Sequence, residues 1–502
     1  MKESRAKFHI TEQKGKMTVT LRHRAAAAML ALAVGVSMVV PAPLLLVSQA
    51  DALESARSAS YDAGTKTSGY FKYRIEKDGT ATIVGCDREA IDYDYEHASR
   101  GERIAIPATI EGAQVVAIAD DALDAHDFIS DARLTLPEGL KRIGARAMRG
   151  WEFDNLPSTL EEIGDEAFAT DPYWDGEDTT EQQTVLHIGG KLPAGLKKVG
   201  KDCFSHSKIG KSLTVPSALS SIGTRAFNCA GLKAIRVAKG NKKYLASGGK
   251  LLTKRPKRLV SYALGRTETA KIPQGVKKIP NRMFARANMK KVVIPASVKH
   301  IGERAFELCK KLKKIKMPNG VTSVGAYACF GCERLQKISM PKKLRSIEDG
   351  VFEYCEALRG KVVIPKKVKS VGCSAFRDCE LADIRLPRGL RYVGEDAFYG
   401  CKRITKVCLP KIRTIGSIAF AECSSLKSVK LSSKLKTIGY DSFKDCKRLK
   451  SVTLGKSLKK VGAGAFSGTS KKLAFKAPKS KVKAYKKLLR KAGVKKPKVR
   501  AL

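Results

Sequence analysis

The sequence is poor in aromatic and in acidic residues. Aromatic side chains make up 7% of the 502 residues, and 96 lysines and arginines outnumber 48 aspartates and glutamates. Surfaces that bind single-stranded nucleic acid stack the bases on exposed aromatic side chains. Most phenylalanines here recur at one repeated position, where we expect them to be buried. We therefore expect nucleic acid to bind only non-specifically, through its phosphates.

Motifs for catalysis and for metal binding are also missing. The seven histidines lie far apart and form no His-Glu-x-x-His pair. Gly210-Lys211-Ser212 and Gly455-Lys456-Ser457 lack the upstream glycine of a phosphate-binding loop. The acidic cluster Asp92–Glu96 lacks the glycine-containing spacing of a calcium loop. We therefore expect a non-catalytic protein with no cofactor and no bound metal.

One apolar run stands out, near the beginning of the chain. Residues 25–47 are apolar, follow the basic segment Arg22-His23-Arg24 and precede the small-x-small sequence Ala50-Asp51-Ala52. This order is typical of a secretory signal peptide, here residues 1–52, cleaved after Ala50 or Ala52. Because the run is long enough to span a bilayer, the alternative is an uncleaved membrane anchor through residues 25–47. Either interpretation predicts an extracellular or cell-surface protein.

A motif of about 23 residues recurs between Ile301 and Cys446. It reads Ile-Gly-x-x-Ala-Phe-x-x-Cys-x-x-Leu-x-x-Ile-x-Ile-Pro-x-x-Val-x-x. Such a period, built on leucine and isoleucine, predicts a leucine-rich repeat solenoid. We expect a curved stack with a parallel β-sheet on one face and irregular or short helical return arms. The glycine, for example Gly325, would supply either a positive φ or a close backbone approach.

The repeat register divides the chain into five segments. Residues 53–69 are expected to form a linker, 70–118 an N-terminal cap unit, and 119–470 the repeats. Two insertions interrupt the repeats. The one near residues 171–183 is acidic and turn-rich, and the one at 237–270 suggests added hairpin strands.

The C-terminal segment, residues 471–502, is rich in lysine and is expected to be a cap helix and tail. Val482, Tyr485, Leu488 and Leu489 form a helical apolar stripe, and Gly493 stands where the helix would stop. Terminal repeats need a cap for their open edge. The alternative is a basic amphipathic helix on an anionic membrane or wall polymer.

The repeated motif resembles the BspA-like (Treponema pallidum-type) leucine-rich repeat. The unit Gly240–Tyr244 is similar to the hairpin-bearing repeat of that family, and the opening from Tyr70 to Ile118 is similar to its N-terminal unit. The resemblance covers about residues 70–470. It implies a bacterial secreted or surface protein that acts in adhesion and binds host or matrix proteins.

Charge is distributed unevenly along the chain. The net charge is +48 overall, about −13 over residues 51–200 and about +56 over residues 201–502. A mildly acidic first third is thus joined to a very basic stack. Asymmetry of this size suggests an anionic partner, such as teichoic acid or a glycosaminoglycan.

Part of the basic charge is expected to form a stripe on the concave face. Outward positions of neighbouring strands should lie about 4.8 Å apart, and aligned cations attract polyanions. The residues of this predicted stripe are Lys314, Lys316, Lys337, Lys361, Arg385, Lys406 and Lys430. Diffuse basic adhesion and simple solubility are the alternatives, because lysines are also abundant elsewhere, at residues 342–343, 366–367 and 459–460.

Seven of the 13 cysteines recur at one repeat position. They are Cys309, Cys332, Cys355, Cys379, Cys401, Cys423 and Cys446. A small, buried, weakly donating side chain suits a turn, so free thiols are expected. Disulfides between neighbouring rungs are the alternative, because stacked rungs approach the required Cα separation.

These patterns together predict an adhesin-like binding protein. A long rigid face would bind through many weak contacts, and lysine charge would speed capture. The alternative function is structural: a wall-associated scaffold anchored by its basic stack, with no selective ligand.

Overall fold

The computed structural model describes most of the chain. The described residues are 10–13, 16–19, 64–87, 91, 103–125, 133–170, 185–409 and 411–502. The apolar run 25–47 and the predicted insertion 171–183 lie outside them. Among the described residues, no helix has the length and apolar character needed to cross a membrane.

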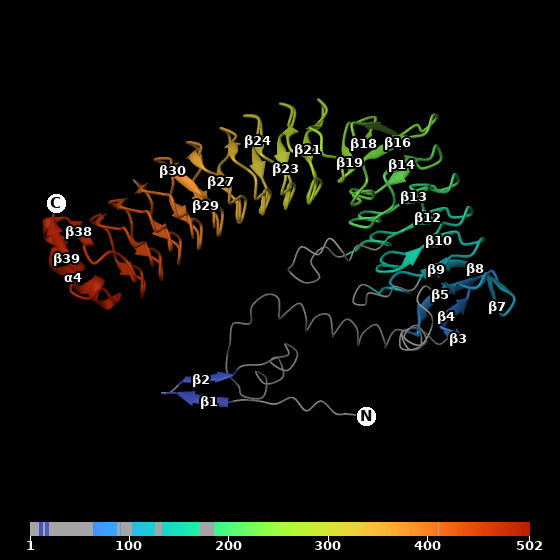
Figure 1. The fold of residues 1–502 in the computed structure, drawn as a ribbon, viewed down its shortest axis with the longest axis horizontal. Helices are drawn as coiled ribbons and strands as arrows, with labels where there is room; N and C mark the ends of the chain where they lie inside the picture. The colour runs from blue at the N-terminus through green and yellow to red at the C-terminus, as the bar shows by residue number, and fades with distance from the viewer. Residues whose placement is uncertain are drawn as a thin grey trace. The chain divides into compact units, whose positions relative to one another are not determined.

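The chain divides into two compact units, Met1–Thr65 and Lys66–Leu502. In the first, β1 (Ile10–Gln13) and β2 (Lys16–Val19) pair antiparallel. The second contains the solenoid (Figure 1). It opens with an antiparallel sheet of β3 (Lys66–Ser68), β4 (Phe71–Ile75) and β5 (Ala81–Cys86). β5 then pairs parallel with β8 (Ala113–Ile118), and β7 (Thr109–Ile110) pairs antiparallel with β8.

The strands that precede a proline in most rungs form a first parallel ladder, here called the Pro ladder. They alternate inward apolar and outward polar residues, as in Lys314-Ile315-Lys316, where only Ile315 is buried. The strands of this ladder are β6 (Arg103–Ala105), β9 (Arg133–Thr135), β11 (Glu152–Phe153), β14 (Ser212–Val215), β16 (Ala234–Val237), β20 (Ala270–Lys271), β22 (Val292–Val293), β24 (Lys314–Lys316), β26 (Lys337–Ser339), β28 (Gly360–Val363), β30 (Leu381–Arg385), β32 (Lys406–Leu409), β34 (Ser428–Leu431), β36 (Ser451–Thr453), β38 (Ala474–Ala477) and β39 (Lys498–Ala501).

A second parallel ladder, which the sequence analysis did not predict, begins with β8 and continues with the two residues before the repeat glycine, or before Pro280 and Glu348 where these replace it. Its strands, here called the Gly ladder, are short because each continues into the turn at the glycine. They are β10 (Arg142–Ile143), β12 (Glu162–Ile163), β13 (Lys198–Val199), β15 (Ser221–Ile222), β21 (Lys278–Ile279), β23 (His300–Ile301), β25 (Ser323–Val324), β27 (Ser346–Ile347), β29 (Ser370–Val371), β31 (Tyr392–Val393), β33 (Thr414–Ile415), β35 (Thr437–Ile438) and β37 (Lys460–Val461).

The predicted solenoid with a parallel β-sheet on one face is confirmed, and of the two predicted forms of return arm, irregular or short helical, the described arms have the irregular one. Each full rung has two short strands, and the described return arms are turns. They cannot become helices because residues of one arm bond to the next rung: the Phe376 N–H donates to Ala397 O at 2.9 Å, and the Phe398 N–H to Ala419 O at 2.8 Å. Backbone groups used between rungs are not free for bonds within a helix.

Phenylalanines stack through the core at the rung spacing. From Phe352 to Phe466 successive ring centroids lie 5.1 to 5.5 Å apart, and the rings of Phe376 and Phe398 are inclined by only 3°. Cys329 occupies the phenylalanine position of its own rung and interrupts the column between Phe306 and Phe352. A single rung could not bury these rings alone, so stacking is what stabilises them.

The repeat glycines are explained by close packing. A Cβ on Gly416 would lie 2.5 Å from the carbonyl carbon of Gly394, and a Cβ on Gly439 would lie 2.5 Å from that of Gly416. On Gly325 it would lie 2.5 Å from the Glu303 nitrogen. None of these glycines has a positive φ. Of the two predicted reasons for glycine, the close backbone approach is the correct one.

The segment expected to form hairpin strands does so, and it divides the core. β17 (Tyr244–Ser247), β18 (Lys250–Thr253) and β19 (Leu259–Tyr262) form an antiparallel sheet between β16 and β20. Buried residues on either side form two separate hydrophobic clusters, with Leu251 in one and Leu252 in the other.

Near the end of the described chain an α-helix precedes the last strand, β39. η1 (Lys479–Lys481) leads into α4 (Val482–Lys491), which contacts β37 and β39. Tyr485 and Leu489 are buried, and the Tyr485 hydroxyl donates to Gly455 O at 2.7 Å. The helix lies where the apolar stripe predicted it, and its role as a cap or as a membrane-binding helix stays a prediction.

Candidate anion-binding faces of the basic stack

All seven residues of the predicted stripe are exposed on the Pro ladder. The register divides them into two columns, because each strand exposes two positions. Lys314 is the partner of Lys337, and Lys406 stands at the corresponding position further along. Lys316, Arg385 and Lys430 occupy the other column. The sequence alone did not separate these columns.

An acidic residue interrupts the first column, and neutral residues interrupt the second. Lys361 is the partner of Asp383, and its Nζ lies 3.4 Å from the Asp383 carboxylate. Val363 is the partner of Arg385, and Cys408 is the partner of Lys430. The predicted stripe is therefore a series of separated cations, one of which already has an acidic partner.

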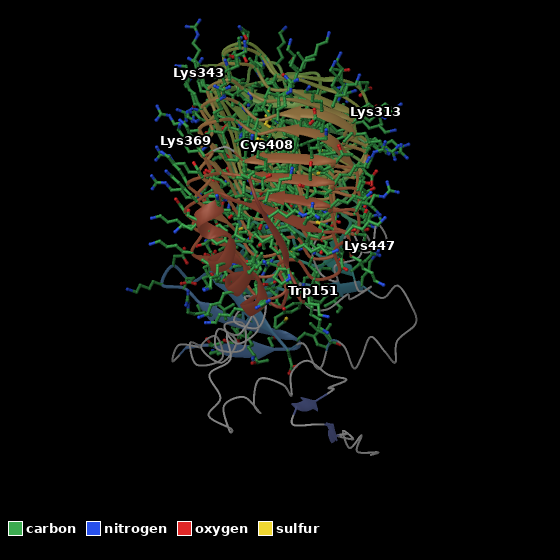
Figure 2. All side chains as sticks on the ribbon, turned by 90° about the vertical axis from the view of Figure 1, so that its left-hand side faces the viewer. Trp151, Lys313, Lys343, Lys369, Cys408 and Lys447 are labelled. Carbon is green, nitrogen blue, oxygen red and sulfur yellow. The ribbon has the colours of Figure 1, made fainter. Side chains whose placement is uncertain are left out.

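Lysines on one flank of the stack, in the turns that lead into the Pro ladder, are mixed with acids. Lys310 Nζ lies 3.2 Å from Glu333, and Arg403 lies 3.8 Å from Glu380. Figure 2 places Lys313 and Lys447 on this flank and Lys343 and Lys369 on the opposite one. Exposed pairs of this kind contribute little to stability, but they reduce the charge available to a ligand.

The opposite flank carries the densest unpaired charge. It consists of the turns that lead from the Pro ladder to the Gly ladder between Pro341 and Val461, here called the corner band. Its cations are Lys342, Lys343, Arg345, Lys366, Lys367, Lys369, Arg388, Arg391, Lys411, Arg413, Lys434, Lys436, Lys456, Lys459 and Lys460, all exposed. These turns contain no aspartate or glutamate. Within the described residues none of these cations forms an ion pair.

Backbone hydrogen bonds align one cation of each rung into a column. The Arg391 N–H donates to Lys369 O at 2.8 Å, and the Arg413 N–H donates to Arg391 O at 2.9 Å. The column continues with the Lys436 N–H, which donates to Arg413 O at 2.8 Å, and the Lys459 N–H, which donates to Lys436 O at 2.8 Å. Sequence reasoning noted lysines here only as charge away from the stripe. The missed signal was a cation repeated two residues before the isoleucine or valine of the glycine motif.

Acidic residues of the basic stack gather instead on the return arms. Arg377 lies 3.9 Å from Glu353, 3.5 Å from Asp378 and 3.4 Å from Asp396. Burial raises the pKa of Glu353 to about 7, and the two neighbouring carboxylates add to the effect while Arg377 opposes it. The return arms therefore mix cations with acids, whereas the turns of the corner band contain no aspartate or glutamate.

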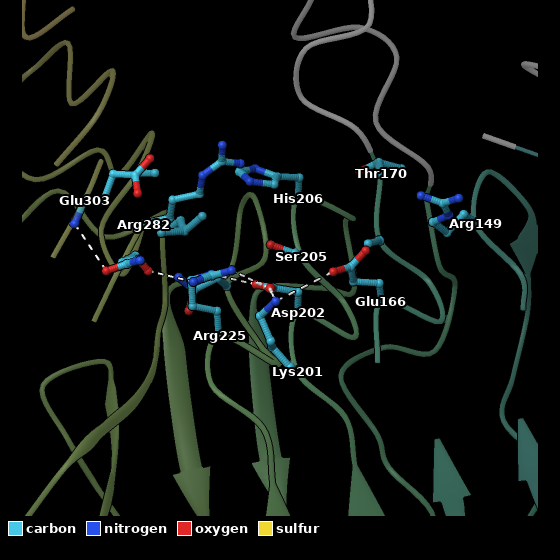
Figure 3. Close-up of a pocket in the computed structure, with 15 residues that line it drawn as sticks. Arg149, Glu166, Thr170, Lys201, Asp202, Ser205, His206, Arg225, Arg282 and Glu303 are labelled. Atoms are coloured by element: carbon cyan, nitrogen blue, oxygen red, sulfur yellow. Dashed lines mark hydrogen bonds and ion pairs between the residues drawn. The ribbon is translucent and has the colours of Figure 1, made fainter. Parts of the chain in front are cut away.

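A polar pocket of about 440 Å³ lies beside the hairpin segment (Figure 3). β19 takes the place of a return arm there, and the Arg225 guanidinium reaches past it to donate to Asn281 O at 2.7 Å. Lys201 and Arg225 both pair with Asp202. Burial and the nearby arginines lower the pKa of His206 to about 3. Because its charges largely satisfy one another, we do not assign a ligand to this pocket.

The described residues include no group of three or more histidine, cysteine, aspartate or glutamate side chains that could hold a metal ion. All 13 cysteines are free thiols. At the repeat position each thiol donates to a carbonyl oxygen of the preceding rung, as from Cys401 to Phe376 at 3.1 Å and from Cys423 to Phe398 at 3.2 Å. The Cys329-Phe-Gly-Cys332 pair is buried with them.

Short parallel strands, glycine contacts and an axial phenylalanine column define a leucine-rich repeat solenoid. The sequence model described as the BspA type leucine-rich repeat region matches residues 188–247, 261–359 and 359–473, in six copies. The chain belongs to this family. No curated protein matches it.

Several solved structures are similar in fold. A leucine-rich repeat protein from Bacteroides ovatus is 20% identical, with 87% of this chain and 99% of that chain covered and a TM-score of 0.44. A leucine-rich cell surface protein from Faecalibacterium prausnitzii is 22% identical, with 74% and 96% covered and a TM-score of 0.41. A leucine-rich repeat protein from T. pallidum is 29% identical, with 37% and 87% covered and a TM-score of 0.31.

Proposed function

We propose that this protein is exported and acts at the cell surface or outside the cell as a non-catalytic, adhesin-like binding protein. Its basic stack would bind anionic surface polymers, such as teichoic acid or a glycosaminoglycan, or the matrix proteins of a host. The observation that carries the proposal is the alignment of exposed, unpaired cations along the stack. Membership of a family of repeat proteins, with a sequence that resembles a signal peptide, supports it.

The mechanism follows from the repetition. One cation on a surface binds an anion weakly in water, because solvent and salt screen the charge. Cations aligned on successive rungs contact successive groups of one polymer, so the later contacts form at high effective concentration. Aligned charge also raises the rate of capture.

The test is a binding measurement with residues 66–502, which form one compact unit with their own core. The ligands are immobilised lipoteichoic acid, heparin and a panel of matrix proteins, each across a salt series. Binding to one ligand that persists at physiological salt supports the proposal. Equal binding to all polyanions that vanishes steeply with salt instead favours the alternative, a wall-associated scaffold anchored by charge.

A further inference from the structure

The corner band combines its cations with a second feature, a neighbouring column of hydroxyl groups. In four successive rungs a cation is followed directly by a hydroxyl residue that begins a Gly-ladder strand. The four pairs are Lys369–Ser370, Arg391–Tyr392, Arg413–Thr414 and Lys436–Thr437. Register aligns Ser370 with Tyr392, Tyr392 with Thr414, and Thr414 with Thr437. The hydroxyls therefore form their own column beside the cations.

Within the part of the chain that the structure describes, these hydroxyls have no hydrogen-bond partner. The hydroxyl groups of Ser370, Thr414 and Thr437 form no hydrogen bond with any described residue, although all three residues are half-buried. Elsewhere in the same column Ser346 donates to Glu348 and Ser323 lies 2.9 Å from His300. Donors that the protein leaves unpaired beside unpaired cations are available to an anionic ligand.

We infer that the corner band from Lys369 to Thr437 selects polymers of sulfate or phosphate groups over polymers of carboxylates, an inference that rests on the proposed function. A sulfate or phosphate ester presents several oxygen atoms in different directions. Such a group accepts hydrogen bonds from a cation and a hydroxyl of one rung and from a cation of the next rung. A carboxylate presents two oxygens in one plane, which Arg391 or Arg413 alone would satisfy in a bidentate pair.

The ligand is linear and lies along the stack. Neighbouring rungs are about 4.8 Å apart, so the four pairs span roughly 14 Å. Two further exposed cations extend the column beyond the four pairs, Arg345 at one end and Lys459 at the other. A single small anion would use one or two rungs. A chain of sulfates or phosphates would use all of them, which favours a polymer.

Toward its C-terminal end, the corner band has the fewest acidic residues beside it. Glu348, Asp349 and Glu395 follow the Gly ladder in the earlier rungs, whereas Ser417, Tyr440 and Ala463 stand at the position after the glycine in the later ones. The pairs Arg413–Thr414 and Lys436–Thr437 should therefore contribute most to binding.

The test removes three of the four hydroxyls, keeps that of Tyr392 and leaves every charge in place. Residues 66–502 carrying Ser370→Ala, Thr414→Val and Thr437→Val are compared with unchanged protein and with a matched control on the Pro ladder, Ser428→Ala, Ser451→Ala and Thr453→Val. Affinities for heparin, for lipoteichoic acid with a poly(glycerol phosphate) chain and for polygalacturonate are measured at one salt concentration. Thermal unfolding checks that all three proteins are folded.

We expect the corner-band variant to bind heparin or lipoteichoic acid about tenfold more weakly, because three net hydrogen bonds at the low end of their usual range together contribute about 1.4 kcal/mol. Its affinity for polygalacturonate should change less than twofold, and the control should match unchanged protein. Comparing the losses for heparin and for lipoteichoic acid shows whether the site prefers sulfate or phosphate groups. Equal losses for all three polymers, equal losses in both variants, or no loss would overturn the inference. If unchanged protein binds none of the polymers, the proposed binding of anionic polymers itself fails.

Discussion

The thiol of Cys379 donates a hydrogen bond to the carbonyl oxygen of Phe352, one rung earlier, with 3.0 Å between sulfur and oxygen. The same bond recurs from Cys446 to Phe420 at 3.1 Å. The cysteine position is therefore a place where a small side chain must also donate. This contact is consistent with the free thiols that the structure has at this position.

Thiol reactivity should follow burial. Ten of the 13 cysteines are buried, whereas Cys373 and Cys408 are exposed. Burial raises the pKa of Cys379 and of Cys423 well above the ordinary value, so little nucleophilic thiolate forms there. Iodoacetamide labelling of the native protein at pH 8, measured by mass spectrometry, should modify Cys373 and Cys408 and leave Cys379 and Cys423 unmodified. Labelling of Cys379 as fast as Cys408 would contradict this account.

Substitution of a ladder cysteine should depend on whether a donor remains. Cys379→Ala removes the thiol donor, while Phe352 O keeps its bond from the Cys355 N–H at 3.2 Å, and should lower the free energy of unfolding by about 0.5–1.5 kcal/mol. Cys379→Ser keeps a donor of similar size and should lower the free energy of unfolding less than Cys379→Ala does. Denaturant unfolding of both variants gives the comparison. An alanine variant as stable as the serine variant would show that the bond contributes nothing.

The repeat glycines should not tolerate a methyl group. Gly416→Ala places a Cβ about 2.5 Å from backbone atoms of Gly394 and should destabilise the stack by about 1–3 kcal/mol, as overpacking does. Gly195→Ala is the control, because nothing lies within 4 Å of its Cβ position and its φ is not positive. Thermal unfolding should separate the two variants, and equal melting temperatures would refute the close-contact explanation.

Stability should fall as pH rises from about 4.5 to about 7. Burial raises the pKa of Glu353 to about 7 from an ordinary value of 4.5, so the folded state keeps a proton that the unfolded state releases. The stabilisation is complete below pH 4.5 and declines through pH 7, by up to about 3 kcal/mol. The pKa values of Asp378 and Asp396 are raised in the same direction.

The matching variant is Glu353→Gln, which cannot ionise. It should show a much smaller decline in unfolding free energy between pH 4.5 and pH 8, with Asp378 and Asp396 accounting for the rest. An unchanged pH dependence in this variant would mean that Glu353 does not titrate in this range.

The acid that interrupts the predicted stripe offers a gain-of-binding test. Asp383→Asn removes the partner of Lys361, 3.4 Å away, and adds one unit of net positive charge. Affinity for heparin at low salt should rise about two- to threefold, because polyanion binding follows the number of available cations. Lys361→Gln should do the opposite or nothing. An Asp383→Asn variant that binds heparin more weakly than unchanged protein would exclude the Pro ladder from the binding surface.

The solenoid, its period and its buried positions were predictable because the apolar residues repeat with the rungs. Ile315, Phe376 and Cys379 are buried where the motif places them. The second ladder was not predictable in the same way, since two residues such as Ser370-Val371 carry no strand pattern of their own. Their pairing becomes visible only in the structure, where each strand lies beside its counterpart in the next rung.

The candidate site was only partly predictable. Outward positions such as Lys314 and Lys430 follow from strand alternation, and the structure exposes them. Whether a cation is paired depends on neighbours one rung away, as with Lys361 and Asp383, or on the geometry of a turn. Alignment of Lys369 with Arg391 and Arg413 became visible only with the backbone bonds that join them.

The most direct test of the account is a lysine footprint. Residues 66–502 are acetylated briefly with and without heparin at physiological salt, and modification of each lysine is quantified by mass spectrometry. The account predicts protection concentrated in the corner band, at Lys369, Lys436 and Lys459, with Lys313 and Lys447 on the opposite flank unchanged. Uniform protection of both flanks, or protection confined to Lys313 and Lys447, would contradict it.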